Sequence, residues 1–232
     1  MMDIFSLISI LSAIGLSGVG SILGIAMTAS VSTRLIAEKP ERFGMALVFT
    51  VLAETPVIYG LLVSLFILMS GSNINDFYSS LSLLGSGISV GVTGLFSGLG
   101  IGIAGSAAVG AISERDDLFG KALVFAVLPE SIVIYGLLVS IIIMRGIGLL
   151  GVNTLYTASS STAYASLVSS AVVCVTGGSG YYLGKTGAKA ISSLLKDEDS
   201  FGKSIVFVVL IEGIAIYGLL VAILLLKGVN ML

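Results

Sequence analysis

The stretch FGKALVFAVLPESIVIYGLLVSIIIM at residues 119–144 decides the fold, because the chain repeats it with small changes at residues 43–69 and 201–226. In each copy a Phe-Gly pair opens the segment, a Glu follows the Phe by 11 residues, and a Tyr-Gly pair begins 5 residues after the Glu. The three glutamates are Glu54, Glu130 and Glu212. Each segment is almost wholly apolar and exceeds the roughly 20 residues that an α-helix needs to cross a bilayer.

The glutamates fall at the middle of these segments. A helix rises about 1.5 Å per residue, so 11 residues place each carboxylate roughly 16 Å along its helix. The hydrocarbon core of a bilayer is about 30 Å thick, so all three carboxylates are expected near its midplane. An ionisable group at that depth is costly and indicates an ion or proton path.

The composition predicts an integral membrane protein. Hydrophobic residues make up 56% of the chain and charged residues only 10%, against about 25% charged in soluble domains. A net charge of -2 argues against nucleic-acid binding, which needs a basic face. The absence of His and the single Cys174 exclude Cys/His metal sites, disulfide frameworks and His-based catalysis. With no nucleophile–base pair or phosphate loop either, we expect no active site of the chain's own.

The apolar spans predict an all-α fold of six transmembrane helices in three tandem hairpins. The N-terminal span has no basic residue before it and begins with Asp3, so we interpret it as a retained helix rather than a signal peptide. The offset between equivalent glutamates is 76 and then 82 residues, and the repeat predicts hairpin domains at 1–75, 76–150 and 151–232. The spans lie at roughly 4–36, 43–70, 79–112, 119–149, 162–194 and 201–229.

The charges predict the orientation. Nine of the 11 basic residues lie in or beside the loops within hairpins, and only Arg145 and Lys227 lie at the opposite ends. The positive-inside rule puts these loops in the cytoplasm and both termini outside. The same loops carry eight of the 13 acidic residues, which are either solvated charge or a docking surface for a cytoplasmic partner.

The two helices of each hairpin differ in bulk. The first is rich in Gly, often at spacings of three or four, and small residues let membrane helices approach closely. The second is rich in Leu, Ile, Val and Phe. This difference favours a concentric two-layer ring with the thin helices inside, although a single compact bundle would also explain the glycines.

Polar groups accompany each glutamate and make up the candidate ion-binding set. A carboxylate in a low-dielectric surrounding can be neutralised by a proton, or it can bind a small hard cation together with other oxygens. Pro56 and Pro129 lie beside two of the glutamates, and proline frees a backbone carbonyl and can kink a helix. A tyrosine lies five residues after each glutamate, a little more than one turn away on the same helix. The set is Glu54, Glu130, Glu212, Thr55, Ser131, Tyr59, Tyr135 and Tyr217; Gly213 follows Glu212 where the other glutamates have a hydroxyl.

These segments resemble the proteolipid (c or K) subunit of the rotary A-type and V-type ATPases, in its triple-hairpin form. The resemblance rests on Phe-Gly-x-Ala-Leu-Val-Phe at 43–49 and 119–125, Leu-Ala-Glu-Thr at 52–55 and Leu-Pro-Glu-Ser at 128–131. It also includes Ile-Tyr-Gly-Leu-Leu-Val at 58–63, 134–139 and 216–221, and it covers essentially the whole chain.

The resemblance implies a membrane rotor that couples ion translocation to ATP synthesis or hydrolysis by a soluble sector. Each glutamate would carry one ion, and copies of the chain would form a homo-oligomeric ring in the bilayer. A stator membrane subunit would supply an arginine, and the loops within hairpins would sit on central-stalk subunits. The family further implies a multi-pass protein of a prokaryotic cell membrane, with transported H⁺ or Na⁺ and no tightly bound cofactor.

The choice of ion stays open. Sodium-binding members of the family pair the Glu with an adjacent hydroxyl, a Tyr, and a Gln on a neighbouring first helix. This chain has no Gln, so we favour protons, with Na⁺ as the alternative. Hydroxyls on the first helices that could replace the Gln are Ser21, Thr28, Ser97, Ser106, Ser179 and Thr186.

Two other classes fit less well. A repeat-built ion channel or secondary transporter would also place a binding site at the midplane. The present repeats are parallel rather than inverted, because each hairpin adds two crossings. A purely structural membrane scaffold would not require a carboxylate at the same internal position of every repeat.

Overall fold

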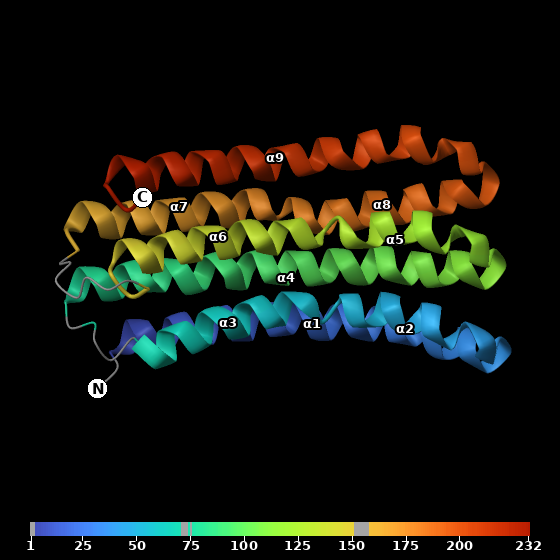
Figure 1. The fold of residues 1–232 in the computed structure, drawn as a ribbon, viewed down its shortest axis with the longest axis horizontal. Helices are drawn as coiled ribbons and strands as arrows, with labels where there is room; N and C mark the ends of the chain where they lie inside the picture. The colour runs from blue at the N-terminus through green and yellow to red at the C-terminus, as the bar shows by residue number, and fades with distance from the viewer. Residues whose placement is uncertain (1–2, 71–73, 75, 151–157) are drawn as a thin grey trace.

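The computed structural model describes residues 3–70, 74, 76–150 and 158–232 of the chain, and these residues form an all-helical fold. Three short 3-10 turns, η1 (Pro40–Arg42), η3 (Asp116–Leu118) and η4 (Glu198–Ser200), lie between helices at one end, and the N- and C-termini lie at the other (Figure 1). The helices are α1 (Ile4–Glu38), α2 (Phe43–Leu52), α3 (Thr55–Ser70), α4 (Phe77–Glu114), α5 (Phe119–Val127), α6 (Glu130–Gly146), α7 (Ser160–Gly177), α8 (Ser179–Lys196) and α9 (Phe201–Gly228). We call α1–α3, α4–α6 and α7–α9 the first, second and third hairpins.

The first helix of each hairpin begins at a side chain that caps it. Asp3 accepts a hydrogen bond from the Ser6 backbone N–H at 2.9 Å, and Asp76 accepts one from Ser79 at 2.8 Å. In the third hairpin the Ser159 hydroxyl accepts from the Thr162 N–H at 3.3 Å. Such caps satisfy backbone donors that the helix itself leaves free, so the starts of α1, α4 and α7 are encoded locally.

Within the described ranges, five helices are long and apolar enough to cross a membrane, and a sixth span results if the bent pair α2–α3 counts as one. This confirms the prediction of six apolar spans. The bend between α2 and α3 is 41°, and a further interruption separates α5 from α6. Both interruptions lie beside a proline, as the sequence predicts. A third one, at Gly178 between α7 and α8, was not predicted and falls at a Gly-Gly pair.

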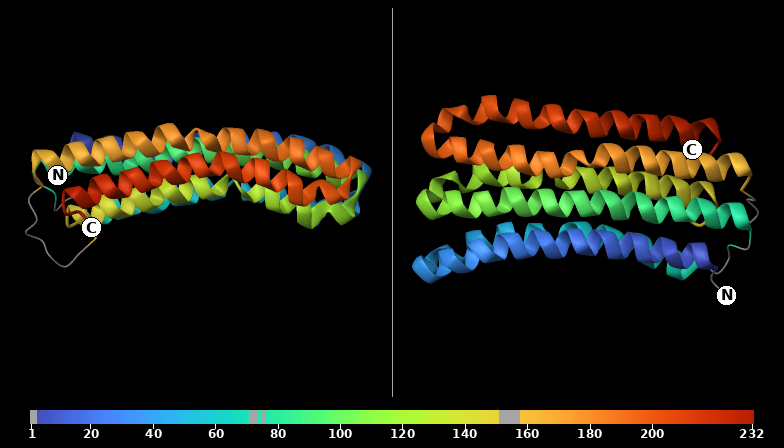
Figure 2. Two further views of the ribbon diagram at one scale, coloured as in Figure 1. Left: turned by 90° about the horizontal axis from the view of Figure 1, so that it is seen from above. Right: turned by 180° about the vertical axis from the view of Figure 1, so that it is seen from behind.

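The hairpins form two layers. The first helices (α1, α4 and α7–α8) lie in one layer and the second helices in the other (Figure 2, left). In the first layer α4 packs between α1 on one side and α7 and α8 on the other. A Cβ on Gly98 would overlap the backbone of Gly20, and one on Gly184 would overlap the backbone of Gly100. Glycine is therefore required where these backbones touch, as in close-packed membrane helices.

Ion pairs and hydrogen bonds near the turns η1, η3 and η4 connect neighbouring hairpins. In η4, Glu198 accepts from Lys121 at 2.6 Å and from Arg115 at 2.8 Å, and both donors belong to the second hairpin. Lys121 and Arg115 hold the pKa of the Glu198 carboxyl below its usual value. From the first hairpin, Lys39 donates to the Ser113 carbonyl at 2.7 Å and Arg42 donates to the Ile112 carbonyl. Each hairpin is thus fastened to the next at this end.

Candidate functional site

The three glutamates occupy the same position along the second helices but lie in different local backbones. Glu54 lies in the short gap between α2 and α3, Glu130 is the first residue of α6, and Glu212 lies inside the unbroken α9. The gap arises because Pro56 has no N–H to donate to the Leu52 carbonyl four residues earlier. Pro129 interrupts the second hairpin in the same way, and the third hairpin has no proline.

The hydroxyls next to two of the glutamates bond to these interrupted backbones. Thr55 Oγ1 donates to the Leu52 carbonyl at 3.0 Å, which is the carbonyl that Pro56 leaves free. Ser131 Oγ donates to the Leu128 carbonyl at 2.9 Å. Their protons therefore satisfy helix carbonyls rather than the neighbouring carboxylates, and their lone pairs remain available to accept a hydrogen bond or bind a cation.

The tyrosines reach the glutamate of the following hairpin. Tyr59 Oη donates to Glu130 Oε1 at 3.2 Å, and Tyr135 Oη donates to Glu212 Oε1 at 2.9 Å. This differs from the expectation that each tyrosine serves the glutamate of its own helix. Five residues turn an α-helix by about 140° beyond a full turn, so the tyrosine faces the neighbouring helix instead. The structure thus joins residues 71 and 77 positions apart.

The two ends of this series are open. Tyr217 in the third hairpin is 70% exposed, and Glu54 in the first hairpin is also exposed. Among the described residues no tyrosine hydroxyl bonds to Glu54, and Tyr217 bonds to no glutamate. One chain therefore holds two tyrosine–glutamate pairs and the two separate halves of a third.

A serine on the first helix lies beside the Glu54 backbone, and the repeat gives it an equivalent in each of the other hairpins. Ser21 is buried; its hydroxyl accepts from the Val57 N–H at 3.1 Å and lies 3.5 Å from the Glu54 carbonyl oxygen. Ser97 and Ser179 follow it at the repeat offsets of 76 and 82 residues. Their buried hydroxyls have no hydrogen-bond partner within the described part of the chain. These three serines are accordingly the best placed of the six first-helix hydroxyls that the sequence offered.

A second series, of phenylalanines, links the hairpins in the same direction. Phe49 is fully buried against Phe119 with ring centroids 5.3 Å apart, and Phe125 is fully buried against Phe201 at 5.4 Å. The equivalent Phe207 is 66% exposed.

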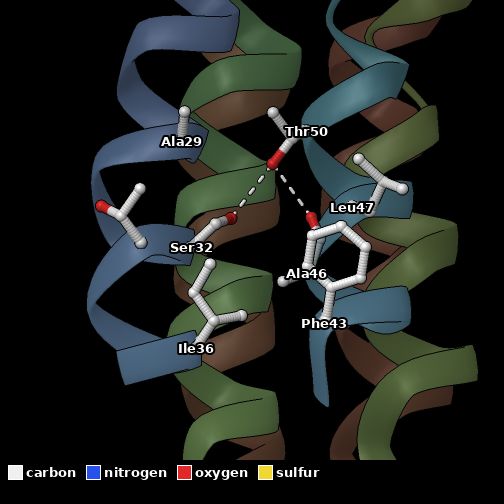
Figure 3. Close-up of a pocket in the computed structure, with 8 residues that line it drawn as sticks. Ala29, Ser32, Ile36, Phe43, Ala46, Leu47 and Thr50 are labelled. Carbon is white, nitrogen blue, oxygen red and sulfur yellow. Dashed lines mark hydrogen bonds between the residues drawn. The ribbon is translucent and has the colours of Figure 1, made fainter. Parts of the chain in front are cut away.

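The first hairpin has an open groove beside Phe43. In the other two hairpins the equivalent phenylalanine packs against a phenylalanine of the preceding hairpin. The groove lies between α1 and α2, and a hydrogen bond of 3.0 Å between Ser32 and Thr50 crosses it (Figure 3). Phe43, the equivalent of Phe119 and Phe201, borders it and is 54% exposed. The residues that line the groove are Ala29, Ser32, Thr33, Ile36, Phe43, Ala46, Leu47 and Thr50.

Comparison with known families agrees with the repeat. The family model for the C subunit of ATP synthase matches the chain three times, at residues 8–67, 84–143 and 167–225. Each match contains one of the three glutamates. The chain belongs to this family.

Individual relatives are components of rotary ATPases. The K subunit of the A-type ATP synthase of Methanocaldococcus jannaschii is 39% identical over 214 residues, which cover 91% of each chain. The K subunit of the V-type sodium ATPase of Enterococcus hirae is 28% identical over 61% of this chain and 90% of its own. The 16 kDa proteolipid of the human V-type proton ATPase is 30% identical over 60% of this chain and 90% of its own. With its apolar helices, the chain is therefore an integral membrane protein of the same kind as these proteolipids.

Proposed function

We propose that this chain is the ion-carrying rotor subunit of an A-type or V-type rotary ATP synthase or ATPase. Glu54, Glu130 and Glu212, one in each proposed hairpin domain (1–75, 76–150 and 151–232), each carry one ion across the membrane. The observation that supports this is the tyrosine–glutamate series, which repeats one hydrogen-bonded pair between successive hairpins. ATP is made or hydrolysed by a soluble sector, and this chain converts ion movement into rotation.

The chemistry follows from the position of the carboxylates. A charged carboxylate in the hydrocarbon layer is costly, and binding a proton or a sodium ion removes that cost. The tyrosine hydroxyl donates to one carboxylate oxygen, as observed for Glu130 and Glu212, so the other oxygen can take the ion. In the pairs Glu130–Ser131 and Glu54–Thr55 a hydroxyl lone pair lies on the next residue, while Glu212 lacks this help.

The open ends of both series support assembly into a ring. Tyr217 of one copy would bond Glu54 of the next, and Phe207 would enter the groove beside the next copy's Phe43. Both contacts join the third hairpin of one copy to the first hairpin of the next, in the order in which hairpins follow one another inside the chain. They can therefore form together. An interface that joins one edge to a different edge generates a closed ring or an open filament. The repeated contacts of one membrane layer favour a ring, with first helices inside and second helices outside.

Rotation requires partners outside the ring. We propose that a stator membrane subunit presents an arginine to each glutamate in turn and so displaces its ion. The three turns η1, η3 and η4 gather charged residues at one end of the fold, which suits a contact with central-stalk subunits. The excess of basic residues at this end supports a cytoplasmic location, with both termini outside a prokaryotic cell membrane.

The ion is proposed to be the proton. The relatives carry both possibilities in their names, since one belongs to a sodium ATPase and others belong to proton ATPases. The chain has no Gln to complete a sodium shell, and α9 has no freed carbonyl or adjacent hydroxyl beside Glu212. Three sites that turn through one stator must carry the same ion, and protonation makes the smallest demand on ligands.

Carbodiimide labelling tests this proposal directly. The reagent attacks protonated carboxyls in apolar surroundings, so the membrane-embedded full chain is labelled across a pH series, with and without Na⁺, and adducts are mapped by mass spectrometry. We expect labelling at all three glutamates that falls as pH rises and does not respond to Na⁺. Protection by Na⁺ would assign sodium as the ion. Absence of labelling at all three glutamates over the whole pH series would refute ion carriage by these residues.

A further inference from the structure

Two lysines lie on an exposed face of α8, inside a part of the helix that is otherwise uncharged. Lys185 and Lys189 are one turn apart and both are exposed, and Tyr182 beside them is 59% exposed. The Lys185 ammonium lies 5.2 Å from the ring centroid of Tyr181. Neither lysine forms an ion pair with any residue that the structure describes. Ion carriage by the glutamates makes no use of this pair.

The repeat indicates which way this face points. Helix α4 is covered on both sides by α1 and by α7 and α8, and α5 and α6 cover it from the second layer. Its remaining accessible stripe includes Ile103 and Ala107, at helical spacing. Lys185 and Lys189 occupy the same positions 82 residues later. The lysines therefore face away from the second helices, toward the inside of the proposed ring, and assembly leaves them accessible.

Other charges on this face lie nearer the turns. Arg34 of α1 occupies the next accessible position of the same stripe, and the equivalent positions in the other hairpins are Gly110 and Ser192. One turn further, the stripe ends in Glu38 and Glu114 and in Lys196. In a ring the third hairpin of one copy adjoins the first hairpin of the next, so Arg34 would reinforce the lysine pair. The acidic side chains lie at least one turn closer to the water.

The depth of the lysines matches lipid phosphates. Ser179 is the repeat equivalent of Ser21, which lies beside the Glu54 backbone, and Lys185 and Lys189 follow Ser179 by six and ten residues. These steps correspond to about 9 and 15 Å along the helix, and half of the hydrocarbon core measures about 15 Å. A lysine stem can extend toward the interface and bring its ammonium to the level of the headgroups. An ammonium held there without a counter-charge is costly.

We propose that Lys185 and Lys189 bind the phosphate of an anionic membrane lipid that is held inside the ring. This rests on the proposed function, because the ring creates the enclosed surface. Apolar residues of the same stripe, such as Met27, Val31 and Ile103, offer contact for the acyl chains. Clusters of basic residues next to a membrane leaflet attract anionic lipids in this way.

Native mass spectrometry of the ring tests the proposal. The full chain is reconstituted into vesicles of equal parts phosphatidylglycerol and phosphatidylcholine, extracted in mild detergent, and analysed for lipids retained on the ring. We expect phosphatidylglycerol to be enriched by roughly fivefold for each lysine. The variant Lys185→Met with Lys189→Met should lose this enrichment and keep the ring mass. The charge-matched control Lys203→Met with Lys227→Met, on α9, should retain it.

Three results would overturn the proposal in different ways. Equal enrichment in the Lys185→Met/Lys189→Met ring would show that the lysines do not select the lipid. Displacement of phosphatidylglycerol by excess inorganic phosphate would show that a soluble anion, rather than a lipid, takes the site. A spectrum with single chains and no ring would remove the enclosed surface itself, and the proposed rotor assembly would then fail separately from the lipid inference.

Discussion

At the residue scale, the site is defined by pairs that lie on different hairpins. Tyr59 serves Glu130 and Tyr135 serves Glu212, so a carboxylate and its hydrogen-bond donor come from helices more than 70 residues apart. The sequence predicted both residue types and their common depth, because these depend on hydropathy and on the rise of a helix. It did not predict that Tyr59 and Tyr135 bond to the glutamate of the next hairpin, because the turn of the helix directs these side chains across to that hairpin.

We predict that Glu130→Gln reduces ion transport by the reconstituted complex to background. A rotor must pass every site through the stator. The Gln amide is uncharged and cannot take up and release an ion as the carboxylate does, so one altered site per chain stops the whole ring. ATP-driven ion uptake into vesicles measures the effect. Glu114→Gln, which removes an exposed carboxylate near η3, should transport normally. Uptake at the wild-type rate by Glu130→Gln would contradict rotary transport.

At the scale of elements, the second helices differ where they bear the glutamate. Pro56 and Pro129 interrupt the first two, and α9 runs unbroken through Glu212. The sequence predicted these two interruptions because proline removes a donor at a known position. It did not predict the interruption at Gly178, since a Gly-Gly pair permits a break without requiring one, and the packing of α7 and α8 against α4 decides.

The turn η4 offers a test of how neighbouring hairpins are fastened. Glu198→Gln removes a carboxylate that accepts from both Lys121 and Arg115, so amide hydrogen exchange at residues 197–200 should accelerate. The acceleration should be modest, because ion pairs at an exposed surface contribute little. Glu114→Gln serves as the control, and an unchanged exchange rate in Glu198→Gln would mean that the pairs do not hold the turn.

The same junction should depend on pH. Because the pKa of Glu198 is lowered in the folded chain, its contribution to stability is present above the usual glutamate pKa of 4.5 and is lost as pH falls through the lower folded value. The difference in exchange between wild type and Glu198→Gln should therefore be present at neutral pH and vanish in strong acid.

At the scale of the whole molecule, one chain is a segment with two unlike edges. The first hairpin presents Glu54 and an open groove, and the third presents Tyr217 and Phe207. Inside the chain the same contacts are made twice. Each exposed edge therefore carries one partner of a contact that the chain already forms between its own hairpins. A closed ring of identical chains would bring these partners together.

A crosslink across that junction tests the assembly. In a Cys174→Ala background, Phe207→Cys with Phe43→Cys should yield a ladder of covalent multimers with a short thiol crosslinker, because these positions would meet between copies. The internal counterpart, Phe125→Cys with Phe201→Cys, joins positions that already touch within one chain and should yield crosslinked single chains. If only the internal pair reacts, head-to-tail assembly is refuted. Denaturing gel electrophoresis separates the two results.

The sequence by itself determined that the chain is a membrane protein of three repeated hairpins with one carboxylate at the same position in each. These properties follow from hydropathy, repeat spacing and helix rise, all of which are local along the chain. The tertiary structure alone decided that Tyr59 and Tyr135 serve the glutamate of the next hairpin and that the Ser21 hydroxyl lies beside the Glu54 backbone. It also decided which edges stay open. These features depend on how far each helix is turned and offset against its neighbours, which packing sets and spacing along the chain does not.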